Sequence, residues 1–541
     1  MNKTRRIFYL PAIVALACFL ILTGCGTKEA PDFDAEYDVI VIGGGMAGLS
    51  AGAHLASNGL KVLLLEQHHK VGGCASNFSR GDFTFETALH LMAGGGPGRN
   101  DRGLYTLLNM CGVYDKVELY ELDDYYRSVF PGVDVVVPNT WDGTVENLKA
   151  QWPEESEGID KFHTLCTGLY DELMSVKNLF RYTGLKAFFV KVQVPLKQKI
   201  FFEYKDKSFQ DLLDECFVSE ELKAVCGHAW VYYGPPPSEE TAIVPMAATE
   251  ALLNDGLFHV MGTSQNLSYA YAERIEELGG TVKVGTLVTK IIIEDGLARG
   301  VETEYGDVYT ARYIVCNTDP HQMIFTLIGE ENLPKDYVDK VKNLEIANSL
   351  LGIYLGLNID LKALGYDDGE ILYSRSLDAD AVYDNMMSGN FAEGAASISI
   401  YTNYGDPVYA PEGKSVVVID AYSNYDYWPK DPEEYQKLKM EKAWEEILVA
   451  ADVIPELANP EYVEEMVVMT PFTLEEYTMN YKGVIYGFYL SPEQWQKIPN
   501  NTPIDNVFIA GNWTQGWHGF SACQVNGWRA ARLILDMEGI E

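Results

Sequence analysis

A short apolar strand followed at once by a glycine-rich turn constrains this chain more than any other feature. Residues 37–42 are mostly β-branched and apolar, and residues 43–48 read Gly-Gly-Gly-Met-Ala-Gly. This pattern predicts a buried parallel strand that enters a tight turn and then a helix. Gly43 permits the turn, Gly45 lets the backbone approach a pyrophosphate, and Gly48 lets the helix pack close to the strand. The open N–H groups of the helix start favour phosphate charge, so the stretch predicts a dinucleotide cradle.

An acidic residue at the end of the next strand completes the cradle. The helix pattern runs to Gly59, and an apolar strand over residues 61–65 ends at Glu66, which lies 18 residues after Gly48. A carboxylate at that position can accept hydrogen bonds from both ribose hydroxyls of an adenosine. A glycine-rich turn in another kind of α/β protein is the alternative, and the order strand, turn, helix, strand, acid disfavours it.

A second glycine pair favours FAD over NAD. Gly72 and Gly73 follow Glu66 by six and seven residues, where the longer phosphate and ribityl chain of a flavin needs another close backbone approach. Residues 65–74, Leu-Glu-Gln-His-His-Lys-Val-Gly-Gly-Cys, and residues 83–90, Phe-Thr-Phe-Glu-Thr-Ala-Leu-His, resemble the flavoproteins with two dinucleotide-binding folds. That family includes phytoene desaturases, carotenoid isomerases and retinol saturases, and the likeness is greatest to the retinol saturases.

The resemblance implies an α/β fold in which a Rossmann-like FAD-binding domain is interwoven with an α+β substrate domain. By this likeness residues 37–100, 251–330 and 466–541 form the FAD-binding domain, and residues 101–250 and 331–465 form the substrate domain. The cofactor-binding residues expected from the motifs and the resemblance are Gly43, Gly45, Met46, Ala47, Gly48, Glu66, Gln67, Gly72, Gly73, Cys74, Val288, Gly511, Asn512, Gly519 and Phe520.

The last segment of the chain is expected to close the site. Residues 506–513 read as a buried strand ending in a glycine turn, and a helix is predicted over residues 522–535. A second helix start near the cofactor can donate N–H groups to the flavin and stabilise negative charge on the reduced ring. Trp513, Trp517 and His518 depart from the small residues often found here in the desaturases, so the substrate is not carried over from them.

Hydride transfer is the chemistry of the flavin, and the protein supplies binding, orientation and electrostatics. The sequence shows no Ser/His/Asp, metal or paired-carboxylate arrangement. Glu86, His90 and His518 lie in segments that approach the flavin ring in the resembled family, so each is a candidate donor of a proton to a substrate carbon. A hydrogen-bonded structural role is the alternative for each of the three.

Size, charge and cysteine spacing limit the classes of partner and site that the chain can have. The chain has 541 residues, 47% hydrophobic and 22% charged, which fits a globular protein of two domains. Its net charge of -37 argues against nucleic acid as a partner, because phosphate backbones bind Lys and Arg. Two of nine cysteines fall in the first 25 residues, and the other seven have no regular spacing. A disulfide framework or zinc site is therefore not expected.

The first residues have the pattern of an export signal. Lys3, Arg5 and Arg6 precede an apolar run over residues 7–22, and the tetrapeptide ending at Cys25 resembles a bacterial lipobox. Residues 1–25 are therefore expected to be a lipoprotein signal, with Cys25 lipid-modified and residues 26–36 as a tether. An uncleaved anchor helix is the alternative. Either arrangement places the protein outside the cytoplasm on a bacterial membrane.

A basic and aromatic segment breaks the acidic character of the chain. Residues 177–207, from Lys177 to Lys207, carry eight Lys or Arg against two acidic residues, interleaved with Phe and Tyr. Such a segment can lie on an anionic bilayer and admit an apolar substrate. The alternative is a solvated helical face that packs on the body by its aromatic side.

These features together predict an exported FAD oxidoreductase that acts on a carbon–carbon double bond of an apolar polyene or isoprenoid lipid, by saturation, desaturation or isomerisation. Because NADH and NADPH are scarce outside the membrane, a reductase needs electrons from a quinol or another redox carrier. The alternatives are an FAD-dependent amine or alcohol oxidase and, from a different class, a lipid-binding escort protein without turnover.

Overall fold

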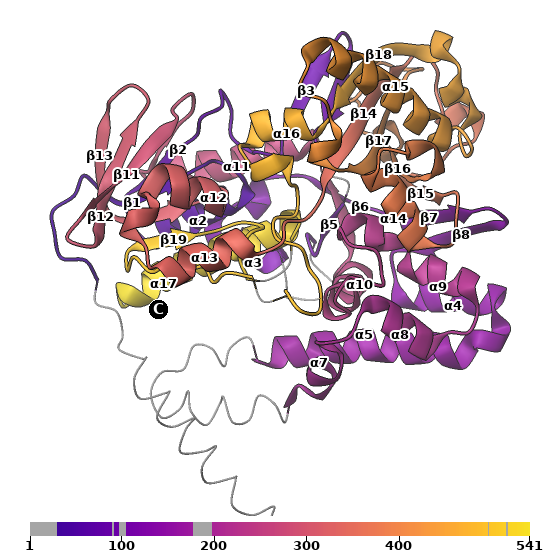
Figure 1. Ribbon diagram of the computed structural model, residues 1–541, viewed down its shortest axis with the longest axis horizontal. Helices are drawn as coiled ribbons and strands as arrows, with labels where there is room; N and C mark the ends of the chain where they lie inside the picture. Colours follow the sequence, from indigo (N-terminus) through magenta and orange to yellow (C-terminus); the bar gives the residue numbers. More distant parts are fainter. Residues whose placement is uncertain are drawn as a thin grey trace, which may run out of the picture.

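Two large β-sheets, connected by segments that pass repeatedly between them, form the body of the protein (Figure 1). The computed structural model describes residues 30–88, 91–96, 104–176, 197–495, 497–515 and 518–540. The proposed leader, Cys25, His90, Trp517 and most of the basic segment lie outside the described residues.

The first sheet is built around the predicted strand. Its parallel part has the order β10 (Thr281–Lys283), β2 (Val62–Leu65), β1 (Tyr37–Ile42), β13 (Val308–Cys316) and β19 (Val507–Ile509). The opposite end of β13 pairs with the antiparallel ribbon of β12 (Leu297–Thr303) and β11 (Val288–Glu294). The parallel sheet with a glycine turn after β1 confirms the predicted Rossmann-like class.

Strand register brings four loops to one edge of this sheet. Ile42 of β1 is level with Leu65 of β2 and with Cys316 of β13, and Cys316 is level with Ile509 of β19. The residues that follow these strands therefore meet at the carboxyl edge, where open α/β sheets bind their ligands.

Both faces of the first sheet are covered, which explains why its central strands β1 and β2 are mostly apolar. Val39 and Val41 pack with α2 (Met46–Ser57), α11 (Ser264–Glu277) and α17 (Phe520–Met537). The alternate side chains Ile40 and Ile42 pack on the other face with α13 (Lys335–Asn343) and the turn of residues 323–328. This alternation follows from the two-residue period of a strand.

The second sheet has the strand order β18 (Val463–Met469), β14 (Ser349–Leu357), β17 (Ser415–Ser423), β16 (Ala395–Ile400), β15 (Glu370–Ser374), β7 (Asp124–Phe130) and β8 (Val133–Pro138). Its pairs are antiparallel except for β7 with β15. One face packs on α14 (Ala379–Met387) and α15 (Pro432–Ala450), and the other faces a helical layer. That layer contains α4 (Trp141–Gln151), α5 (Ser156–Val176), α7 (Lys199–Tyr204), α8 (Phe209–Cys216), α9 (Glu220–Gly227) and α10 (Ile243–Asp255).

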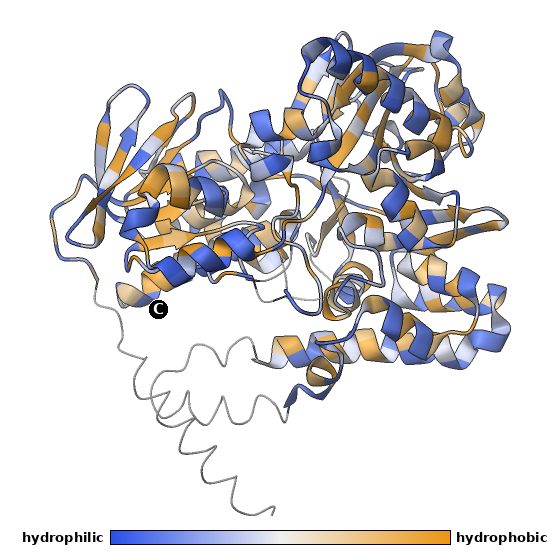
Figure 2. Ribbon diagram, viewed as in Figure 1, coloured by the Kyte–Doolittle hydropathy of each residue, from blue (hydrophilic) through white to orange (hydrophobic). Residues whose placement is uncertain are grey.

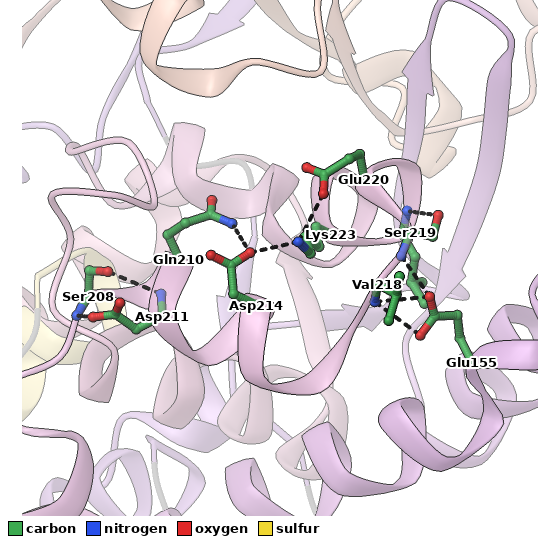
Figure 3. Close-up of polar contacts among 10 residues, drawn as sticks. Glu155, Ser208, Gln210, Asp211, Asp214, Val218, Ser219, Glu220 and Lys223 are labelled. Carbon is green, nitrogen blue, oxygen red and sulfur yellow. Dashed lines mark hydrogen bonds and ion pairs between the residues drawn. The ribbon is translucent and has the colours of Figure 1, made fainter.

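Side chains cap helix starts in the helical layer (Figure 3). Ser208 and Asp211 form a capping box at the start of α8. Glu155, just before α5, accepts hydrogen bonds from the backbone N–H groups of Val218 and Ser219 at the start of α9. Such contacts satisfy N–H groups that a helix start leaves without an intrahelical partner. Along α5 hydrophobic and hydrophilic residues alternate, as expected for a helix with one buried face (Figure 2).

The other strands and short α-helices of the described chain lie outside the two large sheets. They are the ribbon β3 (Asn77–Arg80) and β4 (Phe83–Glu86), the sheet of β5 (Met92–Ala93), β9 (Leu257–Val260) and β6 (Leu119–Glu121), and the helices α3 (Leu104–Cys111), α12 (Pro320–Gln322) and α16 (Pro471–Thr478). Within the described part of the chain, no helix has the length and apolar character needed to cross a membrane.

The chain passes from one unit to the other at residues that differ from the expected domain boundaries. Helix α3 packs on α2 and α17, so the first segment of the FAD-binding unit continues beyond residue 101. Val338 and Val341 of α13 belong to the core of the same unit, which extends it past residue 330. Strand β18 stays in the second sheet up to Met469, beyond the expected return at residue 466. In each case a buried apolar face decides where the element lies.

Candidate functional site

The glycines of the first turn work mainly by letting the backbone pack against itself. Gly43 has a φ of +94°, a left-handed conformation that favours glycine. A Cβ on Gly48 would lie 2.1 Å from the carbonyl oxygen of Gly43, and one on Gly45 would lie 2.7 Å from Oδ1 of Asn317. Gly48 is therefore packed behind the turn, while the bare turn itself borders a cavity.

The Glu66 side chain links the end of the second strand, β2, to the glycine turn that follows the first strand, β1. Its Oε2 accepts a hydrogen bond from the Gly44 N–H (2.6 Å) and its Oε1 accepts one from the His68 N–H (2.8 Å). The side chain is only 7% exposed and borders the cavity. A carboxylate oxygen has two lone pairs, so both oxygens can still accept from a ribose.

The second glycine pair lies directly beside the first turn. The Gly72 N–H donates to the carbonyl of Gly44 (2.8 Å), and the φ values of Gly72 and Gly73 are +129° and +59°. A Cβ on Gly72 would lie 2.3 Å from the carbonyl oxygen of Ala75. Two bare stretches of backbone thus border one channel, as an extended nucleotide with a pyrophosphate requires.

Asn317 is a central residue that the sequence motifs did not single out. Its backbone N–H donates to Ile42 (2.8 Å), its Oδ1 accepts from the Gly48 N–H (3.0 Å), and its Nδ2 donates to the carbonyl of Ala510 (3.1 Å). Asn317 therefore ties together the ends of β1, β13 and β19 and the start of α2. Its one sequence signal is that it is a polar residue directly after an apolar strand. That signal indicates a site residue only once the parallel register shows that the end of β13 lies beside the ends of β1 and β19.

Asn512 plays a similar part at the C-terminal turn. Its Oδ1 accepts from the Gly519 N–H (3.3 Å) and from the Cys523 thiol (2.8 Å), and its Nδ2 donates to the carbonyl of Ile485 (2.8 Å). Its own carbonyl accepts from the ammonium of Lys497 (2.8 Å). The start of α17 is thereby fixed on the wall of the cavity.

One cavity of about 1580 Å³ extends from the cradle to the helical layer under the second sheet. A site for one drug-sized ligand has about 300–1,000 Å³, so this cavity has room for a dinucleotide and a second molecule. Beyond the cradle the wall is largely apolar, and α10 supplies much of it through Ile243, Val244, Ala247, Ala248, Ala251 and Leu252.

Fourteen of the fifteen expected cofactor-binding residues border this cavity, and Gly48 is the exception explained above. The fourteen are Gly43, Gly45, Met46, Ala47, Glu66, Gln67, Gly72, Gly73, Cys74, Val288, Gly511, Asn512, Gly519 and Phe520. Residues from four distant parts of the sequence thus surround one channel.

Of the three candidate proton donors, only His518 is brought to the cavity wall within the described residues. Its ring stacks on Tyr486 with centroids 4.4 Å apart, and in the described part of the chain neither ring nitrogen has a hydrogen-bond partner. Burial and the nearby charge of Lys497 hold the pKa of His518 well below its usual value. The imidazole is therefore neutral at pH 7.

Glu86 has a different place from the one expected. It does not border the cavity, and its carboxylate accepts hydrogen bonds from the N–H (2.8 Å) and the hydroxyl of Ser264, the first residue of α11. The structure thus gives Glu86 the role of fixing a helix start. The physical reason is that a buried carboxylate is stabilised by the N–H groups and dipole there.

Two buried titratable residues that act on each other electrostatically have no signal in the sequence. Lys497 and Glu240 are both fully buried. Burial lowers the pKa of Lys497 to about 7 and raises the pKa of Glu240 well above its usual value. Neither residue stands in a recognisable motif, so only the three-dimensional packing reveals them.

The described residues include no cluster of His, Cys, Asp or Glu that could hold a metal ion. The seven cysteines of the described chain are all free thiols.

A family model described as flavin-containing amine oxidoreductase matches residues 46–535. The chain belongs to the flavin-containing amine oxidoreductase family. It is an FAD-dependent oxidoreductase, and the bare glycine turns, Glu66 and the long channel fit that cofactor.

The relatives in this family act on different molecules. The all-trans-retinol 13,14-reductase of Danio rerio is 26% identical over 513 residues, which cover 88% of this chain and 82% of the relative. The chloroplastic prolycopene isomerase of Daucus carota is 24% identical over 518 residues, covering 94% of this chain and 81% of the relative. Cyclohexylamine oxidase from Brevibacterium oxydans superposes with a TM-score of 0.59 at 16% identity, covering 94% and 100% of the two chains, a likeness of fold.

Proposed function

We propose that this flavoprotein acts on a carbon–carbon double bond of an apolar polyene or isoprenoid lipid, by saturation, desaturation or isomerisation. The observation that carries the proposal is the apolar continuation of the cofactor channel along α10. The names of the relatives, a retinol reductase and a prolycopene isomerase, support the same substrate class. When bound, FAD supplies hydride transfer to or from carbon.

The residues of this chain bind and orient the two molecules. Gly43, Gly45, Gly72 and Gly73 hold the nucleotide through main chain, and Glu66 holds the adenosine ribose. Apolar side chains of α10 hold the lipid and exclude water, which strengthens the electrostatic interactions of the site. A few hydroxyl groups interrupt that apolar wall, among them the Tyr125 and Tyr233 pair (3.3 Å).

His518 is the residue we assign to proton transfer. It borders the cavity next to Asn512 and Gly519, and both of its ring nitrogens lack a partner in the described structure. A neutral imidazole has one N–H donor and one acceptor nitrogen, so it can give a proton at one nitrogen and regain one at the other. In saturation this proton goes to the carbon that does not receive the hydride.

Product masses test the reaction. The protein, in oxidised and in reduced form, is incubated anaerobically with polyene lipids, enones and amines. A gain of two hydrogens indicates saturation, a loss of two indicates desaturation, and a new isomer of unchanged mass indicates isomerisation. Conversion of amines alone, with all polyenes untouched, would overturn the proposal in favour of an amine oxidase.

We further propose that the protein is exported and anchored to a bacterial membrane through a lipid on Cys25. Support comes from the basic residues Lys3, Arg5 and Arg6, the apolar run and the lipobox-like tetrapeptide. On this proposal a quinol or another redox carrier supplies electrons, and the Lys177 to Lys207 segment touches the bilayer. Incorporation of labelled palmitate that Cys25→Ala abolishes is the expected result, and unlabelled wild-type protein contradicts it.

A further inference from the structure

Lys497 has an unusual environment for a lysine. Its side chain is fully buried, and its ammonium donates a hydrogen bond to the backbone carbonyl of Asn512 (2.8 Å). The groups that act on it electrostatically are the Glu240 carboxyl, the Cys523 thiol and the His518 ring. In the described part of the chain neither oxygen of Glu240 has a hydrogen-bond partner. The ammonium is thus partly desolvated and has no bonded counter-ion.

The burial of Lys497 brings its titration close to neutral pH. Burial brings the pKa of Lys497 down to about 7, with Glu240 and Cys523 opposing the shift. The pKa of Glu240 is raised well above its usual value, the pKa of the Cys523 thiol is raised to about 12, and the pKa of His518 is held far below its usual value. The Cys523 thiol and the His518 ring are therefore neutral when Lys497 titrates, and Glu240 is the neighbour whose negative charge favours the protonated lysine.

Lys497 is hydrogen-bonded to a residue of the cavity wall. The backbone carbonyl of Asn512 accepts a hydrogen bond from the Lys497 ammonium. The side-chain Oδ1 of Asn512 accepts hydrogen bonds from the Gly519 N–H and the Cys523 thiol. Asn512 and Gly519 both border the cavity at the start of α17, whose N–H groups carry partial positive charge. Negative charge that arrives on this wall therefore stabilises the protonated form of Lys497.

We propose that Lys497 is a redox-linked proton-binding residue: with FAD bound in the channel that Asn512 borders, Lys497 would bind one proton when the flavin takes up two electrons and would release it when they leave. With dithionite as the reductant, two electrons and one proton go to the flavin and the second proton goes from water to Lys497. On reoxidation by a carbon–carbon double bond, one carbon receives hydride and the other a proton, and Lys497 loses its proton. The proposal depends on bound FAD and not on the lipid substrate.

The midpoint potential of the bound flavin, measured from pH 6 to 9 without substrate, tests this. Its pH slope gives the number of protons taken up per two electrons. With a pKa of about 7, Lys497 loses its proton above about pH 7. Negative charge on the reduced flavin would raise this pKa. We therefore expect a one-proton slope below pH 7 and a two-proton slope, twice as steep, above it.

Variants separate the titration of Lys497 from its charge. Lys497→Met should show the one-proton slope throughout and a lower potential below pH 7. Lys497→Arg should keep the higher potential with the one-proton slope, because arginine does not titrate in this range. Glu240→Gln should move the break to lower pH. Lys439→Met is the control, since Lys439 also has a lowered pKa but is only partly buried, on α15, and does not border the cavity.

The proposal would be overturned if Lys497→Met or Lys497→Arg kept the two-proton slope above pH 7. It would also be overturned if Lys439→Met lost that slope. FAD content and thermal unfolding are measured on every variant. If Lys497→Met does not retain FAD, the pH slope of the midpoint potential of Lys497→Arg tests the proposal instead. Failure of the substrate proposal leaves these results unaffected, because no lipid is present.

Discussion

At the scale of single residues, the site depends on where a side chain is absent. Gly48→Ala puts a Cβ 2.1 Å from the Gly43 carbonyl, so the strand and helix must separate. Overpacking of this kind costs about 1–3 kcal/mol, and we expect lower thermal stability together with loss of FAD. Gly227→Ala, where the nearest atom is a flexible leucine methyl group at 3.1 Å, is the control and should retain both.

Glu66 should contribute to FAD affinity through hydrogen bonds to a charged group. Each such bond contributes about 1.5–3 kcal/mol, so Glu66→Ala should weaken FAD binding by roughly ten- to a hundredfold. Glu66→Gln keeps one acceptor oxygen and should have an intermediate effect. Fluorescence titration of the apoprotein with FAD measures both, and equal affinity of Glu66→Ala and wild type would contradict the assigned role.

His518→Phe distinguishes stacking from proton transfer. A phenyl ring can keep the contact with Tyr486, so FAD content should be unchanged, whereas turnover should fall by about 10²–10⁴ if the imidazole moves a proton. Because the pKa of His518 is held well below its usual value, wild-type turnover should show no protonation step of this residue between pH 6 and 9. Full turnover in His518→Phe would exclude the role.

At the scale of elements, Glu86 shows how a motif residue can serve the fold. Glu86→Ala removes the acceptor of two hydrogen bonds at the start of α11, and we expect a loss of about 1.5–3 kcal/mol in unfolding free energy. The spectrum and potential of the flavin should stay close to those of wild type, because the carboxylate does not border the cavity. A large shift in potential without destabilisation would instead favour a role at the flavin.

The elements that sequence could predict are those whose signals are local. The strand of residues 37–42, its glycine turn and the acid at residue 66 lie within 30 residues, and the spacing alone defines their geometry. Asn317 and Lys497 could not be foreseen, because their partners Ala510, Gly48 and Asn512 come from other parts of the chain. The packing of α3 with the first unit has no local signal near residue 101, because α3 looks like any apolar helix until its packing partners are known.

At the scale of the whole molecule, the interwoven chain makes one cavity serve two ligands. Ala248 and Ala251 of α10 border the part of the cavity beyond the cradle. Ala251→Trp should fill that part and reduce turnover of long polyenes at least tenfold, with FAD binding unchanged because the cradle is on the other sheet. Loss of FAD in this variant, or full turnover, would show that the apolar end is not the substrate site.

The most direct test of the account is whether an apolar lipid binds against the flavin. FAD fluorescence of the holoprotein is titrated with an unconjugated isoprenoid alcohol, which has no visible absorption of its own. We predict a saturable change in the wild type that is absent in Ala251→Trp and is not produced by a short alkylamine. No change with the isoprenoid, together with a saturable change caused by the amine, would contradict the account.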